Sequence, residues 1–67
     1  MMDIHLNGET REIPDGLNLL GLVEHLGLEP SWVVVEHNVV AVDRTLWAAT
    51  PVLAGDQVEL VRFMGGG

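Results

Sequence analysis

One segment of the 67-residue sequence has the spacing of an amphipathic helix, and apolar residues on both sides of it are arranged as in β-strands. The apolar positions of this segment are Leu19, Leu22, Val23 and Leu26. They recur every three or four residues and so form one stripe on a helix. Asn18 is a candidate N-cap and Gly27 a candidate C′ residue, while Pro30 prevents extension. Gly21 lowers the helix propensity by about 1 kcal/mol relative to alanine, so packing must hold this short helix.

Before the helix, the sequence predicts a β-hairpin. Ile4 and Leu6 alternate with polar residues, and Asn7-Gly8 is a dipeptide favoured in two-residue hairpin turns. Residues 10–13 are expected to form the returning strand.

After the helix, the sequence predicts three more strands. Residues 32–36 are so continuous in valine that we expect a central strand buried on both faces. A turn at His37-Asn38 and a short strand over residues 39–42 should follow. The last strand is expected over residues 57–63, with Trp47 as the apolar anchor of the irregular segment before it.

This order predicts an α+β domain of the β-grasp type, a mixed sheet with one main helix packed on one face. The last strand is expected to pair parallel with the first, because the chain between them is long enough to serve as the crossover. We expect residues 1–63 to form the domain and residues 64–67 a flexible C-terminal glycine tail.

The composition narrows the class of protein. Ten acidic residues against three arginines give a net charge of −7, which repels nucleic acid and would steer the chain towards a basic protein partner. The alternative is that the charge only keeps the protein soluble. No apolar run exceeds four residues, so we expect neither a membrane span nor a secretory signal, and a cytoplasmic location. The absence of cysteine fits a reducing compartment.

The sequence ends in Gly65-Gly66-Gly67 after Met64. Glycine has no Cβ, so such a tail fits a channel too narrow for other residues. The α-carboxylate of Gly67 would be ionised at neutral pH and able to attack an electrophile such as the α-phosphorus of ATP. A frayed chain end is the alternative reading of the same glycines.

Val61 and Phe63 are expected on the open face of the last strand, beside the tail, whereas Val58 and Leu60 are expected to face the helix. An exposed apolar spot rimmed by charge often marks an interface, so this pair is a candidate partner-binding patch. The alternative is that strand twist tucks Phe63 into the edge of the core.

Other residues do not suggest chemistry. His5, His25 and His37 lack metal-ligand spacing, so no metal site is expected. Trp32 and Trp47 are expected to act as core or loop anchors, and no catalytic motif is present. Asp56 is expected to organise its turn.

The sequence resembles the ThiS family, the ubiquitin-like sulfur carrier proteins of thiamine biosynthesis, over essentially its whole length. The segments that carry this resemblance are Ile4-His5-Leu6-Asn7-Gly8, Gly16-Leu17, Leu19-Leu20, Val35-Glu36-His37-Asn38, Arg44, Trp47, Gly55-Asp56-Gln57-Val58-Glu59-Leu60 and Gly65-Gly66-Gly67. The terminal Gly-Gly is the most specific of them.

The resemblance implies a protein-borne cosubstrate rather than an enzyme, with no bound cofactor. An E1-like adenylyltransferase (ThiF type) would use Mg-ATP to adenylate Gly67, and a persulfide sulfur donor would convert the adenylate to a thiocarboxylate. Thiazole synthase (ThiG type) would receive the sulfur. Two alternatives remain open at this point: a carrier of the molybdopterin synthase small-subunit type, and a ubiquitin-like interaction module that is never activated.

Overall fold

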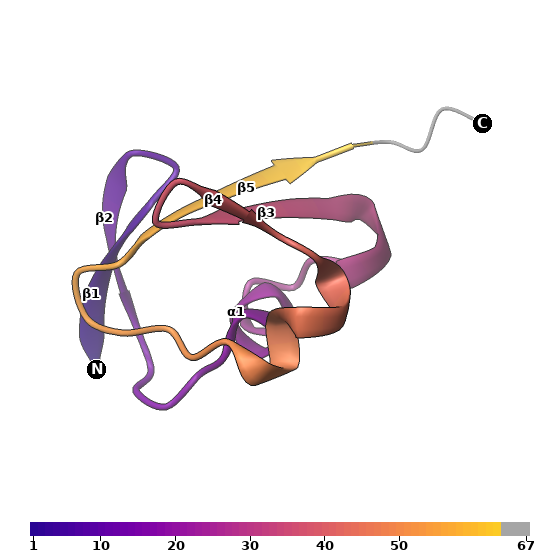
Figure 1. Cartoon of the computed structure of the whole chain (residues 1–67). Coiled ribbons are helices and arrows are strands. Elements are labelled where there is room, and N and C mark those ends of the chain that lie inside the picture. Colours follow the sequence, from indigo (N-terminus) through magenta and orange to yellow (C-terminus); the bar gives the residue numbers. More distant parts are fainter. Residues whose placement is uncertain (64–67) are drawn as a thin grey trace.

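The computed structural model describes residues 1–63, and its first two strands form the hairpin that the sequence predicts (Figure 1). Strand β1 (Met2–Leu6) pairs antiparallel with β2 (Glu9–Ile13). Asn7 and Gly8 have φ values of 51° and 81°, the two left-handed positions that a type I′ turn requires. The turn chemistry therefore sets the register of the hairpin.

Helix α1 (Leu19–His25) begins and ends as predicted. The Asn18 Oδ1 atom accepts a hydrogen bond from the Gly21 N–H at 2.7 Å, and Gly27 follows the helix with a φ of 75°. A Cβ at Gly21 would lie 3.3 Å from both Asn18 Oδ1 and Leu17 Cδ2. Glycine at this helical position thus leaves the N-cap contact undisturbed.

Three later strands complete a five-stranded sheet. They are β3 (Val33–His37), β4 (Val40–Val42) and β5 (Gln57–Arg62). The strand order is β2-β1-β5-β3-β4, with β5 parallel to β1 and antiparallel to β3. The predicted parallel pairing of the last strand with the first is confirmed, as is the mixed sheet with one main helix on one face (Figure 1).

Two 3₁₀ helices connect these elements. The first, η1 (Pro30–Trp32), leads into β3, and the second, η2 (Arg44–Ala49), follows β4. Trp47 in η2 is 1% exposed, and its indole N–H donates to the Val42 carbonyl at 2.9 Å. It is the anchor that the sequence predicts.

The core lies between α1, η2 and the face of the sheet that they cover. Its buried members are Ile4, Leu6, Ile13, Leu19, Leu22, Val23, Val33, Val35, Trp47, Val52 and Val58. Burying an aliphatic side chain of this size stabilises the fold by roughly 1.5–3 kcal/mol. In a chain without cysteine, this burial is the main favourable contribution to folding.

The expectation that the valine-rich strand is buried on both faces is wrong. Val33 and Val35 are buried, but Val34 between them is 47% exposed. Because α1 and η2 cover one face of the sheet, alternate residues of β3 point away from the core. Trp32, expected as an anchor, is likewise 48% exposed at the end of η1.

The short fourth strand is one residue shorter than expected. Asn38 and Val39 form the turn between β3 and β4, with φ values of 50° and 73°. The strand therefore begins at Val40. A left-handed φ is unusual for a β-branched residue such as valine.

Across residues 1–63, no helix has the length and apolar character needed to cross a lipid bilayer.

Candidate functional site

The last described residues of the chain pair with the beginning of β3. Val61 lies opposite Val34 in the antiparallel register, and the Phe63 N–H donates to the Trp32 carbonyl at 2.9 Å. These pairings hold the final residues of the described chain against a fixed part of the sheet. Phe63, the last described residue, therefore lies beside η1 and the first residues of β3.

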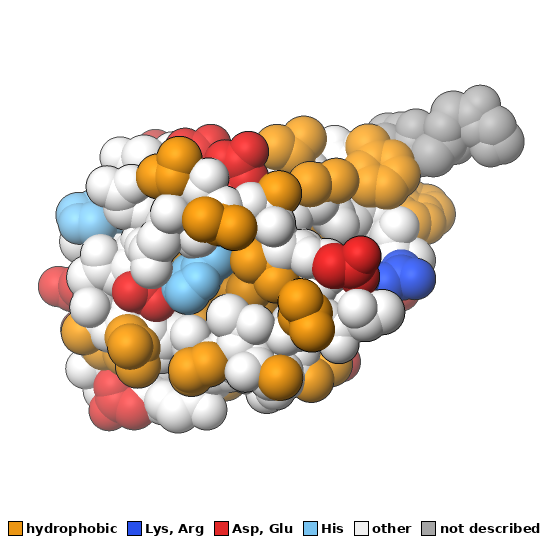
Figure 2. Space-filling view, in the orientation of Figure 1, with side chains coloured by type: hydrophobic (Ala, Val, Ile, Leu, Met, Phe, Trp, Pro, Cys, Tyr) orange, Lys and Arg blue, Asp and Glu red, His pale blue; other side chains and the backbone are white. Residues whose placement is uncertain are grey.

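Four exposed apolar side chains gather at this end of the described chain. We call them the terminal patch: Trp32, Val34, Val61 and Phe63, exposed by 48%, 47%, 58% and 45%. Val34 and Val61 share the open face of the sheet, since their neighbours Val33, Val35 and Leu60 face the core. Figure 2 shows hydrophobic side chains gathered beside the end of β5.

Two carboxylates border the terminal patch on the same strands. Glu36 and Glu59 lie directly opposite each other on the open face, and both are exposed. Like charges in directly opposed positions destabilise a sheet. An apolar patch that continues into a pair of opposed carboxylates is complementary to a partner surface with an apolar centre and a basic edge.

Sequence reasoning placed Val61 and Phe63 on the open face, and their exposure agrees with a docking patch rather than with burial of Phe63 in the core edge. Their role in partner binding stays a prediction. Trp32 and Val34 were missed as members of the patch. The alternation of the valine run was the available signal for Val34, because a sheet with one helical layer leaves every second residue uncovered.

The other predicted site residues are Met64, Gly65, Gly66 and Gly67, and they lie outside the described residues. Their proposed roles in tail insertion and modification stay predictions. So does the boundary between the domain and the tail.

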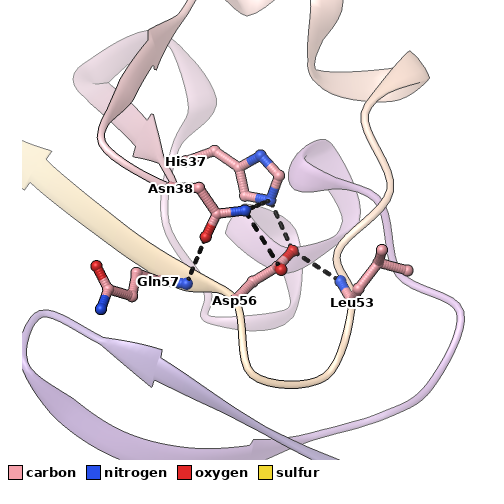
Figure 3. A network of polar contacts seen from close by, with 5 residues as sticks. All are labelled: His37, Asn38, Leu53, Asp56 and Gln57. Carbon is pink, nitrogen blue, oxygen red and sulfur yellow. Dashed lines mark hydrogen bonds and ion pairs between the residues drawn. The ribbon is translucent and has the colours of Figure 1, made fainter.

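A polar network at the opposite end of β3 was not foreseen (Figure 3). The His37 Nε2 atom lies 2.7 Å from Asp56 Oδ2, which also accepts a hydrogen bond from the Leu53 N–H at 2.9 Å. Asn38 Oδ1 accepts from the Gln57 N–H at 2.9 Å. Together these contacts join the β3–β4 turn to the turn before β5.

The electrostatics of this network favour an ionised Asp56. Partial burial opposes ionisation, but hydrogen bonds from the Leu53 N–H and the His37 ring outweigh it and lower the pKa of Asp56 from its ordinary 3.8. The predicted role of Asp56 in its turn is confirmed by the Leu53 contact. The geometry is that of a structural clasp, and it extends that role to a second turn.

Within residues 1–63, no three His, Asp or Glu side chains are grouped so that they could hold a metal ion. Among the described residues, the arrangement that remains for function is the terminal patch.

Known proteins align with nearly the whole of this chain. The sequence profile of the ThiS family matches residues 4–67. A thiazole synthase from Magnetococcus marinus is 44% identical over 66 residues, and one from Paramagnetospirillum magneticum is 35% identical over the same length. Each alignment covers 98% of this chain but 20% of the relative, so the chain spans about a fifth of the length of these curated relatives.

Solved structures give the same picture. The crystal structure of a thiamine biosynthesis protein (ThiS) from Geobacter metallireducens superposes with a TM-score of 0.84 at 35% identity, covering 98% of this chain and all of that one. A solution structure of a thiamine biosynthesis protein from the same organism gives a TM-score of 0.82 at 35% identity, with 98% and 88% of the two chains covered.

Proposed function

The chain belongs to the ThiS family, and on that premise we propose that it is a sulfur carrier for thiazole formation in thiamine biosynthesis. The match of the family profile from residue 4 to residue 67 carries this proposal, because it spans both the domain and the glycine tail. The similarity to ThiS structures and to part of two thiazole synthases supports it. The protein would act as a cosubstrate, and its partners would supply the catalysis.

The proposed chemistry takes place at the Gly67 carboxylate. One carboxylate oxygen attacks the α-phosphorus of Mg-ATP in an E1-like adenylyltransferase of the ThiF type, forming an acyl-adenylate and releasing pyrophosphate. The outer sulfur of a persulfide donor then attacks the acyl carbon and displaces AMP, which leaves the carrier joined to the donor through an S–S bond. A thiol reduces that bond, forming a disulfide with the donor and releasing the carrier as a thiocarboxylate. A thiazole synthase of the ThiG type accepts that sulfur. Because the first step consumes Mg-ATP, we place the pathway in the cytoplasm.

The proposal requires the domain to dock as well as the tail. Ordering three tail residues loses on the order of 3–6 kcal/mol of backbone entropy. Four residue steps from Phe63 to Gly67 reach roughly 13 Å when extended, which is enough to enter a neighbouring active site while the domain stays outside. The terminal patch lies where the chain leaves the sheet, so burying Val61 and Phe63 would offset that entropy at the entrance to the site.

The acidic border supports the same docking mode. A partner with basic side chains facing Glu36 and Glu59 would relieve their mutual repulsion and speed the encounter with a chain of net charge −7. The terminal patch therefore combines an apolar contact with electrostatic steering.

Intact-protein mass spectrometry tests the function. The chain is incubated with Mg-ATP, a ThiF-type enzyme and a persulfide donor, and the expected product has one terminal oxygen replaced by sulfur. The thiocarboxylate should then support thiazole formation by a ThiG-type enzyme but not sulfur transfer by the large subunit of molybdopterin synthase. An unchanged mass would favour a binding module, and transfer to molybdopterin synthase would favour the other carrier class.

A further inference from the structure

A hollow of about 300 Å³ lies on the helix-covered side of the sheet, away from the terminal patch. Its apolar lining comes from the hairpin, from the chain that follows α1 and from β5: Leu6, Leu26, Leu28 and Leu60. Leu60 pairs with the buried Val35, which places the hollow on the core side of β5. We call it the arginine groove, for the two residues described next.

Arg11 and Arg62 also line this groove. They are two of the three arginines in a chain that has no lysine and ten acidic residues. Both are exposed, and neither forms an ion pair with another residue of the described part of the chain. No aspartate or glutamate lines the groove. The local charge is thus opposite to the charge of the whole molecule.

Asn7 adds a third donor to the lining. Its Oδ1 atom accepts a hydrogen bond from the Leu60 N–H at 2.8 Å, which fixes the orientation of the amide. The amide oxygen is thus occupied, and the NH₂ group is the donor that this residue adds to the lining. The groove therefore offers apolar surface and hydrogen-bond donors, but no carboxylate acceptor.

We propose that the arginine groove binds an acidic segment of a partner protein. An apolar side chain of that segment packs on the leucines, and its neighbouring carboxylates accept hydrogen bonds from Arg11 and Arg62. A planar guanidinium binds a carboxylate through two parallel N–H···O bonds, which suits this task better than a lysine would. Charge complementarity at this one place selects an acidic segment over a basic one.

This proposal is independent of the sulfur carrier function. The terminal patch is on the open face of the sheet, whereas Leu60 and Arg62 are on the helix side. A partner in the arginine groove would therefore leave the terminal patch uncovered. The two surfaces can be occupied at the same time.

The test is a nuclear magnetic resonance titration of the whole chain with acetyl-Glu-Leu-Glu-amide. We expect shifts of the Leu28, Leu60 and Arg62 amides. The double variant Arg11→Gln/Arg62→Gln should raise the Kd at least about tenfold, since charge-assisted hydrogen bonds are lost. Arg44→Gln, which removes the third arginine outside the groove, should change the Kd less than about twofold.

A second peptide, acetyl-Gln-Leu-Gln-amide, separates charge recognition from apolar contact. It should bind at least about tenfold more weakly than the acidic peptide. The proposal is overturned if the two peptides bind equally or if the double variant and Arg44→Gln have equal effects. It is also overturned if the shifts are confined to other residues, or if no shift is seen at about 10 mM peptide. Overlay of the remaining amide signals shows that the variants are folded.

Discussion

Val34 and Val61 face each other across β3 and β5 on the uncovered side of the sheet, and both are about half exposed. A monomer gains little from two aliphatic side chains in that position, while a partner that covers them gains their transfer from water. Val61 lies two residues before Phe63, the last described residue. It therefore identifies the surface on which the carrier proposal depends.

The first prediction concerns this terminal patch. Val61→Gln/Phe63→Ala should raise the KM of the activating enzyme for the carrier at least tenfold and leave kcat nearly unchanged, because docking is lost and the chemistry at Gly67 is not altered. Steady-state adenylation assays measure both constants. The matched control Leu46→Gln/Leu53→Ala removes equally exposed apolar groups elsewhere and should behave as wild type. A KM that is unchanged in the patch variant would exclude this surface from docking.

Replacing one of the opposed carboxylates, Glu36 and Glu59, should raise the stability of the protein but slow its association with a partner. Glu59→Lys converts a repulsive cross-strand pair with Glu36 into an attractive one and should raise the free energy of unfolding by about 0.5–1 kcal/mol. The same change should slow association with a basic partner and weaken its salt dependence. Urea denaturation and stopped-flow association rates measure the two effects. A variant that is both more stable and faster to bind would contradict the steering argument.

The β3–β4 turn contains a residue that fits its backbone poorly. Val39 is 81% exposed and has a φ of 73°, where a β-branched side chain is strained by roughly 1–2 kcal/mol. Val39→Gly should therefore stabilise the protein by up to about 1 kcal/mol after the entropy of glycine in the unfolded chain is counted. Val40→Gly, one residue later in the strand, should destabilise it. Thermal unfolding of both variants tests the comparison, and destabilisation by both would argue against strain at Val39.

The Asp56 clasp predicts a loss of stability in acid. The pKa of Asp56 is lower in the folded chain than its ordinary 3.8. The contribution of Asp56 to the free energy of unfolding is therefore complete at pH values above the pKa of the unfolded state. It is lost as the pH falls through the pKa of the folded state. Asp56→Asn should lower the free energy of unfolding at pH 7 and flatten its decline between about pH 5 and pH 2. Urea denaturation at several pH values measures this. Glu24→Gln, at an exposed helix position, should keep the wild-type profile.

Most of the features that the sequence alone could predict are local. The Asn7-Gly8 turn and the Asn18 cap depend on residues within a few positions of one another, so both can be predicted without knowing the fold. Even the parallel pairing of first and last strands follows from chain length and the position of one helix. Burial of Val34 was misjudged because a run of valines does not reveal how many layers cover a sheet.

The features that sequence could not predict depend on strand order. His37 and Asp56 are 19 residues apart, and they meet because β3 lies next to β5. Arg11 and Arg62 line the same groove because β1 lies between their strands. Neither of these contacts can be predicted from the spacing of neighbouring residues in the sequence. Contacts of this kind require the order β2-β1-β5-β3-β4 to be known first.

The last prediction concerns the glycine tail, residues 64–67. Its proposed role depends on the absence of side chains that would block entry into a narrow channel. A graded series at one position separates steric exclusion from loss of flexibility: Gly66→Ala should reduce adenylation partly, and Gly66→Val should abolish it, because the branched side chain would block a narrow channel. Intact mass after incubation with Mg-ATP, the activating enzyme and the sulfur donor reports the product. Unfolding curves should overlay for all three proteins, because the buried core is formed by residues between Ile4 and Val58. If the valine variant is loaded at the wild-type rate, the channel is not narrow, and the glycines have no steric reason to be where they are.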